Sequence, residues 1–202
     1  MDVAGDAASI AALRQGRADL LAPLCERHTP ALYRLAYRLA GEAHAAEDLV
    51  QETWIRLLRQ PPRLEPGASA LPWLRRVLVR LAIDRGRSGA RRPAQASGLQ
   101  VGEELPDPGP APPEAAMLAD QRRRVRDALD RLPPGYRAIL VLLHGEGMSV
   151  REVAAILTLP ESVVKNRAMR GRRRLREIVE AQAHEGEGEV TVDGQAARSP
   201  AH

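Results

Sequence analysis

The sequence contains little cysteine, lysine or aromatic side chain. Cys25 is the only cysteine among 202 residues, so an intramolecular disulfide is impossible and a cysteine-based metal site is not expected. Two tryptophans and three tyrosines are the only aromatic residues, which argues against modules that stack bases on aromatic rings. Strands favour aromatic and β-branched residues, whereas Ala, Leu and Arg dominate here. The composition therefore predicts an all-α protein.

Signals for membranes and for catalysis are also missing. No apolar run is long enough to span a membrane, and no signal peptide is evident, so we expect a cytoplasmic protein. The five histidines are scattered, and no catalytic triad, phosphate-binding loop or metal-ligand spacing is present. We therefore expect no catalytic residue, no cofactor, no metal and no small-molecule substrate. Cys25 is expected to be buried packing rather than an oxidation sensor.

The charge is unevenly distributed along the chain, although its net value is only +4. Basic residues crowd into Arg75–Arg92 and Lys165–Arg176, and acidic residues gather in Glu42–Glu52, Glu103–Glu114 and Glu180–Asp193. All basic residues but one are arginine, whose planar fork suits phosphate and guanine recognition. A biased base composition of the genome explains the arginine excess at least as well.

Periodicity and chain breakers predict two small helical domains on a flexible linker. Helical patterns run over residues 10–60 with a stop at Gly41, and again from Pro72. Prolines and glycines then dissolve the pattern until apolar periodicity returns near Leu118. We predict a first domain over 10–88, a Pro/Gly-rich linker over 89–113, a second domain over 114–180 and a disordered tail over 181–202.

The stretch Ser149–Arg176 predicts a helix-turn-helix. Ser149 and Glu152 form an S-x-x-E capping box that starts the first helix. Thr158-Leu159 makes the turn, after which Val163 and Ala168 are expected to point inward. The second helix ends in a run of arginines without an acidic residue. Such a helix can lie in the DNA major groove while its basic end holds the flanking phosphates.

The second helix of this motif has an outward face that matches base edges. Lysine and arginine match guanine acceptors, asparagine matches adenine, and methionine can contact a thymine methyl group. The residues expected to contact bases are Lys165, Asn166, Met169 and Arg170. The residues expected to hold phosphates are Arg167, Arg172, Arg173, Arg174 and Arg176. The alternative interpretation is a basic, solvated helix.

The first domain combines an acidic face with a basic helix. Asp48, Gln51 and Glu52 fall at i, i+3 and i+4, so they share one helix face that suits an arginine-bearing protein partner. Ordinary helix solvation is the alternative. The segment Trp73–Arg87 carries five arginines and one aspartate, a net +4. Trp73 is expected in the core rather than against an unstacked base.

These segments, in this order, resemble the extracytoplasmic-function class of bacterial sigma factors. The matching segments are Ala45–Arg59, Pro72–Arg87, Leu132–Leu157 and the helix that follows, with a proline-rich linker between the second and third. With Leu20–Gly41, the resemblance covers most of residues 10–178. It implies two helical domains and a promoter-specificity subunit that binds core RNA polymerase, directs promoter-specific initiation and helps to open the duplex.

The resemblance also implies roles for particular residues. Asp48, Gln51 and Glu52 would bind a coiled coil of the largest polymerase subunit. The loop Leu64–Ala70 would capture a flipped base of the −10 element, and the second domain would read the −35 element. Acidic linker residues would approach the RNA exit path: Glu103, Glu104 and Asp107. The residues implied in recognition and melting of the −10 element are Leu64, Ala68, Trp73, Arg76 and Arg80.

The implied partners are core polymerase, double-stranded promoter DNA, the melted −10 strand and an anti-sigma factor, which in some members is membrane-bound and would hold the protein at the inner membrane face. Two departures from the family pattern matter below. Arg80 stands where asparagine is common, and Thr158 stands where the turn usually has glycine. A β-branched residue is poor at positive φ, so Thr158 predicts a slightly different turn.

Two other functions fit the sequence less well. A stand-alone helix-turn-helix regulator would bind operator DNA as a dimer, but the sequence offers no obvious dimerisation helix or ligand pocket, and the acidic face would go unexplained. An enzyme is a more distant alternative, because no catalytic constellation is present.

Overall fold

The computed structural model describes residues 4–89 and 123–189, all the rest lying outside the described part of the chain. No strand occurs in the described residues, which confirms the all-α prediction. The first part holds α1 (Ala4–Arg14), the 3₁₀ turn η1 (Ala18–Leu20), α2 (Leu21–Ala40), α3 (Ala43–Arg59) and α4 (Leu71–Gly89). Residues 123–130 are helical and are followed by α6 (Pro134–Leu140), a π-helical turn η2 (Val141–Gly145), α7 (Val150–Leu157) and α8 (Glu161–Glu189).

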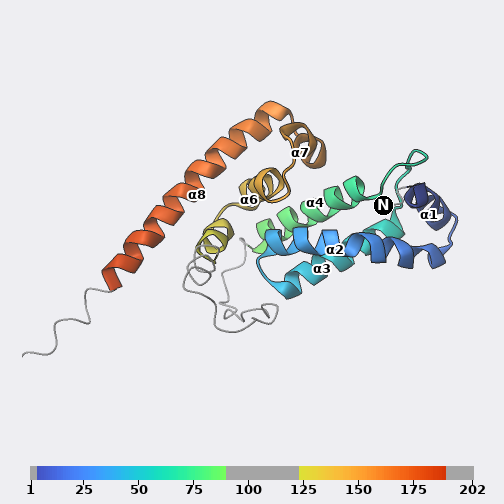
Figure 1. Ribbon diagram of the computed structural model, residues 1–202, viewed down its shortest axis with the longest axis horizontal. Coiled ribbons are helices and arrows are strands. Elements are labelled where there is room, and N and C mark those ends of the chain that lie inside the picture. The colour runs from blue at the N-terminus through green and yellow to red at the C-terminus, as the bar shows by residue number, and fades with distance from the viewer. Residues whose placement is uncertain (1–3, 90–122, 190–202) are drawn as a thin grey trace, which may run out of the picture.

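The first domain is a bundle of α2, α3 and α4, with α1 at the end distant from the second domain (Figure 1). The helical pattern predicted over residues 10–60 is confirmed, since its apolar positions are buried, including Leu32 on α2 and Leu57 on α3, each fully inaccessible. Gly41 ends α2 at φ 83°, a left-handed conformation that favours glycine. The predicted helix stop at this residue is therefore confirmed.

The second domain packs α6 and α7 against α8, which extends away as a long rod (Figure 1). Pro134 occupies the first turn of α6, where a missing N–H costs nothing. One detail of the predicted core was wrong, because Val164 rather than Val163 is the fully buried residue of α8. In α7 the buried residues are Val153, Ala154 and Ile156. Ala168 points inward as predicted.

The two domains lie against each other, since α4 contacts both α6 and α7. Their buried side chains form one continuous apolar cluster. The contact is close enough to require glycine at one place: an ideal Cβ added to Gly86 of α4 would lie 2.5 Å from Cγ of Pro134. A hydrogen bond also joins the two domains: Arg38 Nη1 of the first domain donates to Oε1 of Glu146 in the second over 2.6 Å.

The helix bounds differ from the predicted domain limits at both ends. The first domain begins with α1 at Ala4, before the predicted residue 10. Helix α8 continues to Glu189, so the predicted tail 181–202 starts within a helix rather than in a disordered segment. Residues 190–202 lie outside the described part, as does the predicted linker 89–113 except for Gly89, the last residue of α4.

Candidate DNA and protein interfaces

The helix-turn-helix begins with the predicted capping box. Ser149 Oγ accepts from the backbone N–H of Glu152 over 3.3 Å, and Glu152 Oε2 accepts from the backbone N–H of Ser149 over 2.8 Å. The hydrogen bonds from the Ser149 hydroxyl and backbone lower the pKa of Glu152. Both orphan donors at the helix start are thereby satisfied, which fixes the position of α7 ahead of the turn.

The turn itself contradicts one expectation. Thr158 adopts φ 55° and ψ 49° and caps α7 in the left-handed conformation. The usual turn is thus retained despite the β-branched side chain, and Thr158 is the only residue other than glycine with positive φ in the described part of the chain. The Thr158 hydroxyl also accepts a hydrogen bond, which Arg80 Nη2 of α4 donates to Oγ1 over 2.6 Å. The side chain that strains the turn also provides a contact with the first domain.

The predicted base-reading residues lie together and in solvent. All four are exposed on α8, and Met169 keeps 58% of its surface accessible although it is apolar. An exposed methionine among cationic and amide groups is suited to contact with a thymine methyl group. The four residues, one turn apart in pairs, are Lys165, Asn166, Met169 and Arg170.

The arginines assigned to phosphates follow on the same helix. Arg172, Arg173 and Arg174 are exposed, and Arg167 is half-buried. Arg173 has an intrahelical partner, since its Nε lies 3.5 Å from Oε1 of Glu177 with both side chains largely exposed. Such exposed pairs contribute little and are readily exchanged for another anion. The pair leaves Arg173 able to turn to a phosphate.

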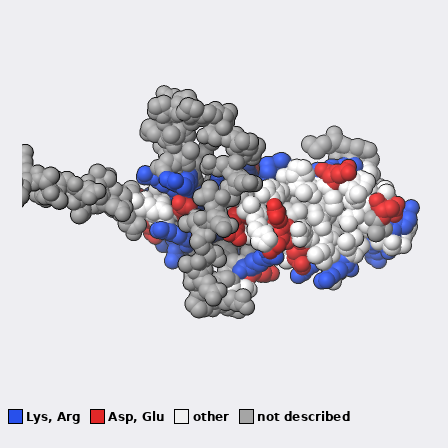
Figure 2. All heavy atoms as spheres, turned by 90° about the horizontal axis from the view of Figure 1, so that it is seen from below, with Lys and Arg blue, Asp and Glu red and all other residues white. Residues whose placement is uncertain are grey.

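The acidic face of α3 is accessible but partly paired with arginine. Gln51 is exposed, and Asp48 and Glu52 are half-exposed. Asp48 Oδ2 accepts from Arg85 Nη1 over 3.2 Å, and Glu52 Oε1 accepts from Arg56 Nε over 3.1 Å. Figure 2, seen from below, shows acidic side chains near the middle of the described surface with basic ones around them. The face already binds guanidinium groups of its own chain.

The residues implied in −10 recognition line the 64–70 loop and α4. Leu64 and Trp73 are half-buried and pack on the apolar core, whereas Arg76 and Arg80 are exposed. Trp73 thus packs against the core without being fully buried, and whether it also contacts an unstacked base stays a prediction. Between these residues the chain turns tightly at Pro66-Gly67, where Gly67 has φ 78° and Ala68 N–H donates to Glu65 C=O over 2.9 Å. A proline followed by a glycine at positive φ is the signature of a type II turn.

A buried aspartate holds the end of this loop, and the sequence interpretation missed it. The Asp6 side chain is 1% exposed, and its Oδ2 accepts from Ala70 N–H over 2.9 Å and from Ser69 Oγ over 3.2 Å. The same carboxylate accepts from His28 Nε2 over 2.8 Å and from Arg27 Nη1. We call Asp6, Arg27, His28, Ser69 and Ala70 the Asp6 cluster.

Burial opposes ionisation of Asp6, but the hydrogen bonds from Ala70, His28 and Arg27 outweigh it and hold its pKa below the ordinary value. A sequence signal for this residue existed. Asp6, Ile10 and Leu13 fall at i, i+4 and i+7, and all three are buried. A lone acid on an apolar stripe predicts a buried, paired carboxylate.

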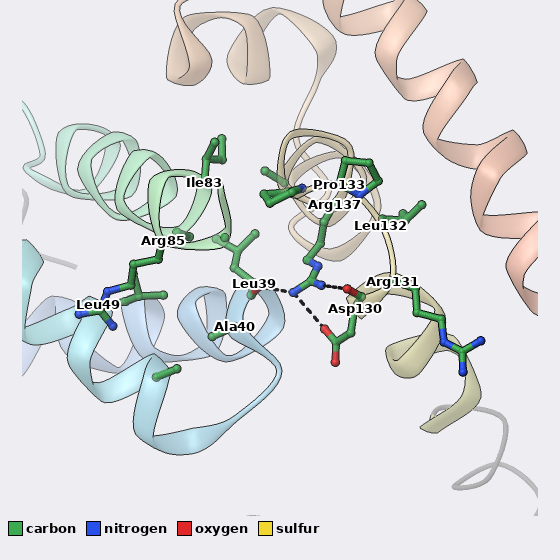
Figure 3. A pocket seen from close by; sticks show the side chains of 15 residues that line it. Leu39, Ala40, Leu49, Ile83, Arg85, Asp130, Arg131, Leu132, Pro133 and Arg137 are labelled. Carbon is green, nitrogen blue, oxygen red and sulfur yellow. Dashed lines mark hydrogen bonds and ion pairs between the residues drawn. The ribbon is translucent and has the colours of Figure 1, made fainter. Parts of the chain in front are cut away.

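A groove of about 600 Å³ lies between the domains (Figure 3). It is lined mostly by apolar residues such as Leu39, Ile83 and Pro133. Arg137 crosses one end, where its Nη1 donates to Leu39 C=O over 3.0 Å and lies 3.0 Å from Asp130 Oδ1. Burial raises the pKa of Asp130 and lowers that of Arg137. Because the Arg137 guanidinium at this end is already paired with the Asp130 carboxylate and with Leu39 C=O, we interpret the groove as a packing feature of the domain contact.

Residues 4–89 and 123–189 contain neither a candidate metal site nor a candidate membrane span. No cluster of three or more histidine, cysteine or acidic side chains there is arranged to hold a metal ion. None of the helices in these ranges is long and apolar enough to cross a bilayer. Cys25 is half-buried and unpaired, and burial raises the pKa of its thiol.

Two family models match the chain. Sigma-70 region 2 matches residues 24–92, and Sigma-70 region 4 matches residues 122–175. The first match covers most of α2 and all of α3 and α4, and the second runs through α6 and α7 into α8. The order of the two agrees with the domain order described above.

Known proteins resemble the chain over most of its length. It is 38% identical to the ECF RNA polymerase sigma factor SigE of Mycolicibacterium smegmatis over 77% of this chain, but spans only 60% of that relative. It is 32% identical to the RNA polymerase sigma factor CarQ of Myxococcus xanthus over 82% of this chain and 92% of the relative. The fold also matches that of the sigma factor RpoE of Bartonella quintana, which was solved in complex with the anti-sigma factor NepR. The TM-score is 0.53 and the sequence identity is 24%, over 77% of this chain and 94% of that one.

The matches agree with the geometry in both parts of the molecule. A helical bundle with an acidic face corresponds to region 2, and a helix-turn-helix with an exposed basic face corresponds to region 4. The chain belongs to the extracytoplasmic-function RNA polymerase sigma factors, the family that directs promoter-specific transcription initiation.

Proposed function

We propose that the exposed face of α8 reads the −35 element while the first domain opens and holds the −10 element. The observation that carries the proposal is the solvent-facing set of two cations, one amide and one thioether on α8, the helix that follows the capped α7 and its turn. Each good bidentate contact to a base is worth about 1–3 kcal/mol of discrimination. The base contacts assigned are Lys165, Asn166, Met169 and Arg170, and the phosphate contacts are Arg167, Arg172, Arg173 and Arg174.

The first domain supplies attachment to polymerase and single-strand capture. Asp48, Gln51 and Glu52 present carboxylates and an amide to arginines of a polymerase helix, and the intramolecular partners Arg85 and Arg56 show that the two carboxylates accept guanidinium donors. Extruding a base costs a few kcal/mol of unstacking, which polymerase contacts would offset. The residues assigned to the −10 element are Leu64, Ala68, Trp73, Arg76 and Arg80.

An anti-sigma factor is the proposed regulatory partner. The fold is shared with a sigma factor solved with such a protein bound. On α3, Ile55 and Leu58 stay 39% and 45% exposed beside the acidic face, and an apolar patch rimmed by charges is suited to a partner helix. The proposal places the protein in the cytoplasm, with no catalysis of its own and no cofactor.

Run-off transcription with purified core polymerase tests this function. Adding the protein should yield a transcript from a cognate promoter, and omitting either component should abolish it. DNA footprinting and mass measurement of the protein alone form the second arm. If no promoter-dependent transcript appears while the protein alone protects an operator as a dimer, the chain is a stand-alone regulator instead.

A further inference from the structure

The Asp6 cluster joins three parts of the first domain that are distant in sequence. Asp6 belongs to α1, Arg27 and His28 belong to α2, and Ser69 and Ala70 immediately precede α4. An ionised carboxylate can only accept hydrogen bonds, so Nε2 of His28 is the donor in that pair. Four donors from two segments therefore converge on one side chain that solvent does not reach.

The cluster fixes the C-terminal arm of the 64–70 loop. Ala70 is fully buried and its C=O accepts from Leu74 N–H over 3.0 Å in the first turn of α4. Ser69 Oγ accepts from Leu71 N–H over 3.2 Å while donating to Asp6. The carboxylate therefore lies at the N-terminus of α4, where the helix dipole favours negative charge. The Asp6 carboxylate therefore holds both the end of the 64–70 loop and the start of α4.

The N-terminal arm of the loop is held differently. Leu64 packs on the apolar core, and the tip Glu65–Gly67 is exposed. The loop is thus anchored by apolar contact at one end and by the Asp6 carboxylate at the other, leaving the tip and Ala68 to face solvent or a ligand. Hydrogen bonds depend on direction whereas apolar contacts do not, so the Asp6 carboxylate, rather than the packing of Leu64, determines the orientation of the loop.

We propose that Asp6 is a positioning residue for base selection: it sets the geometry of the 64–70 loop and so determines which unpaired −10 base the loop accepts. The inference rests on the proposed role of that loop in capturing a base. Helix α1 therefore does more than pack against the bundle, because its buried carboxylate, that of Asp6, binds the end of the loop. Removing the charge should loosen selection of the base without weakening attachment to polymerase, because α3 carries that attachment.

The experiment uses holoenzyme reconstituted with the full chain. Asp6→Asn removes the charge and keeps the shape, and Ser69→Ala removes one loop-side donor while leaving Asp6 paired with Arg27 and His28. Asp19→Asn is the matched control, since Asp19 is an exposed aspartate in the same N-terminal region. Each holoenzyme is offered a pool of fork-junction DNAs with an intact −35 duplex and randomised unpaired −10 bases, and the bound fraction is sequenced. Core affinity and hydrogen exchange at the Ala70 amide are measured in parallel.

Wild-type and Asp19→Asn holoenzymes should show a base preference at one or more unpaired positions. Asp6→Asn should reduce that preference about tenfold and Ser69→Ala about threefold, with core affinity unchanged within about twofold, as expected for lost orientation of one recognition contact. The Ala70 amide should exchange at least about tenfold faster in Asp6→Asn.

Equal preferences in wild type, Asp6→Asn and Ser69→Ala would overturn the role of Asp6 alone. A wild-type holoenzyme that transcribes but selects no unpaired base would overturn the proposed role of the loop, and the role of Asp6 with it. Should Asp6→Asn fail to fold, Ser69→Ala decides: a reduced preference at normal core affinity supports the proposal, and an unchanged one refutes it.

Discussion

Arg80 of α4 donates a hydrogen bond to the hydroxyl of Thr158 in the turn of the helix-turn-helix, over 2.6 Å. Both residues differ from those common at these positions in sigma factors of this class. The two unusual side chains contact each other. The β-branched residue that a left-handed turn disfavours is thus engaged by an arginine from the other domain. In this arrangement the exposed Arg80 guanidinium already has a protein partner, so a contact with the −10 element must share or replace this bond.

A double-mutant cycle should detect this bond. Arg80→Ala and Thr158→Val each remove one partner, and Thr158→Val keeps the β-branched shape. We expect a coupling of about 0.5–1 kcal/mol in the free energy of unfolding by denaturant, the range for an exposed bond to a charged group. The same cycle with Arg76→Ala, an exposed arginine of α4, should give no coupling. Equal coupling for the two arginines would show that the hydrogen bond is not the cause.

Thr158 should tolerate glycine better than alanine. Both substitutions remove the hydroxyl, so they differ mainly in their tolerance of φ 55°. A residue with a Cβ costs roughly 1–2 kcal/mol in this conformation. Thermal or urea unfolding should therefore find Thr158→Gly more stable than Thr158→Ala by about 1 kcal/mol, after glycine's larger chain entropy is offset. An alanine variant of equal or greater stability would mean that the turn is not left-handed in solution.

The two groups of cations on α8 should differ in what they contribute to DNA binding. Arg170→Ala should cost about 1–3 kcal/mol on the preferred −35 sequence and relax preference at one position. Arg173→Ala should weaken every sequence alike and lower the salt slope by about 1. Holoenzyme binding to a −35 duplex library at two salt concentrations measures both. A uniform loss from both variants would remove the distinction.

The acidic face of α3 should govern affinity for core polymerase. Asp48→Ala combined with Glu52→Ala should weaken core binding at least about tenfold, because two charge-assisted contacts are lost. Glu26→Ala is the control, since Glu26 is an exposed glutamate on α2 rather than on α3. Binding is measured by fluorescence anisotropy with labelled core enzyme. If the control weakens binding as much as the double variant, net charge rather than the face is responsible.

Acid should destabilise the first domain through Asp6. The pKa of Asp6 is lower in the folded state than in the unfolded chain, so its ionised form stabilises the fold. This contribution is fully present above the ordinary aspartate pKa of about 4 and is lost as pH falls through the lower folded value. Denaturant unfolding between pH 6 and about pH 3 should show a steeper loss for wild type than for Asp6→Asn. Parallel curves for the two proteins would be inconsistent with a depressed pKa.

Local sequence signals accounted for the helices and the outward faces. Gly41, Pro72 and the Ser149–Glu152 pair act within a few residues of where they stand, so their effects can be read from the sequence. The exposure of Met169 also follows from its place on the helix. The base-reading role of Met169 was predicted from its chemistry, whereas the −10 roles of Leu64 and Arg76 came only from the resemblance.

The contacts between distant residues could not be predicted in this way. Arg38 and Glu146 are 108 positions apart, and many arginines and glutamates could have paired equally well by charge. Their choice depends on how α4 meets α6 and α7, which apolar packing decides. The shift from Val163 to Val164 has a related cause, since the register of a helix after a turn depends on where the turn delivers the chain.

The close approach of Gly86 to Pro134 means that the two domains can pack in this way only if residue 86 has a hydrogen atom in place of a side chain. Any other amino acid at residue 86 brings a carbon to a place only 2.5 Å from the proline ring, and neither a helix backbone nor a proline can yield as a flexible side chain would. One methyl group would act as a wedge between the halves. A larger residue at position 86 would therefore push the two domains apart or require a different packing between α4 and α6.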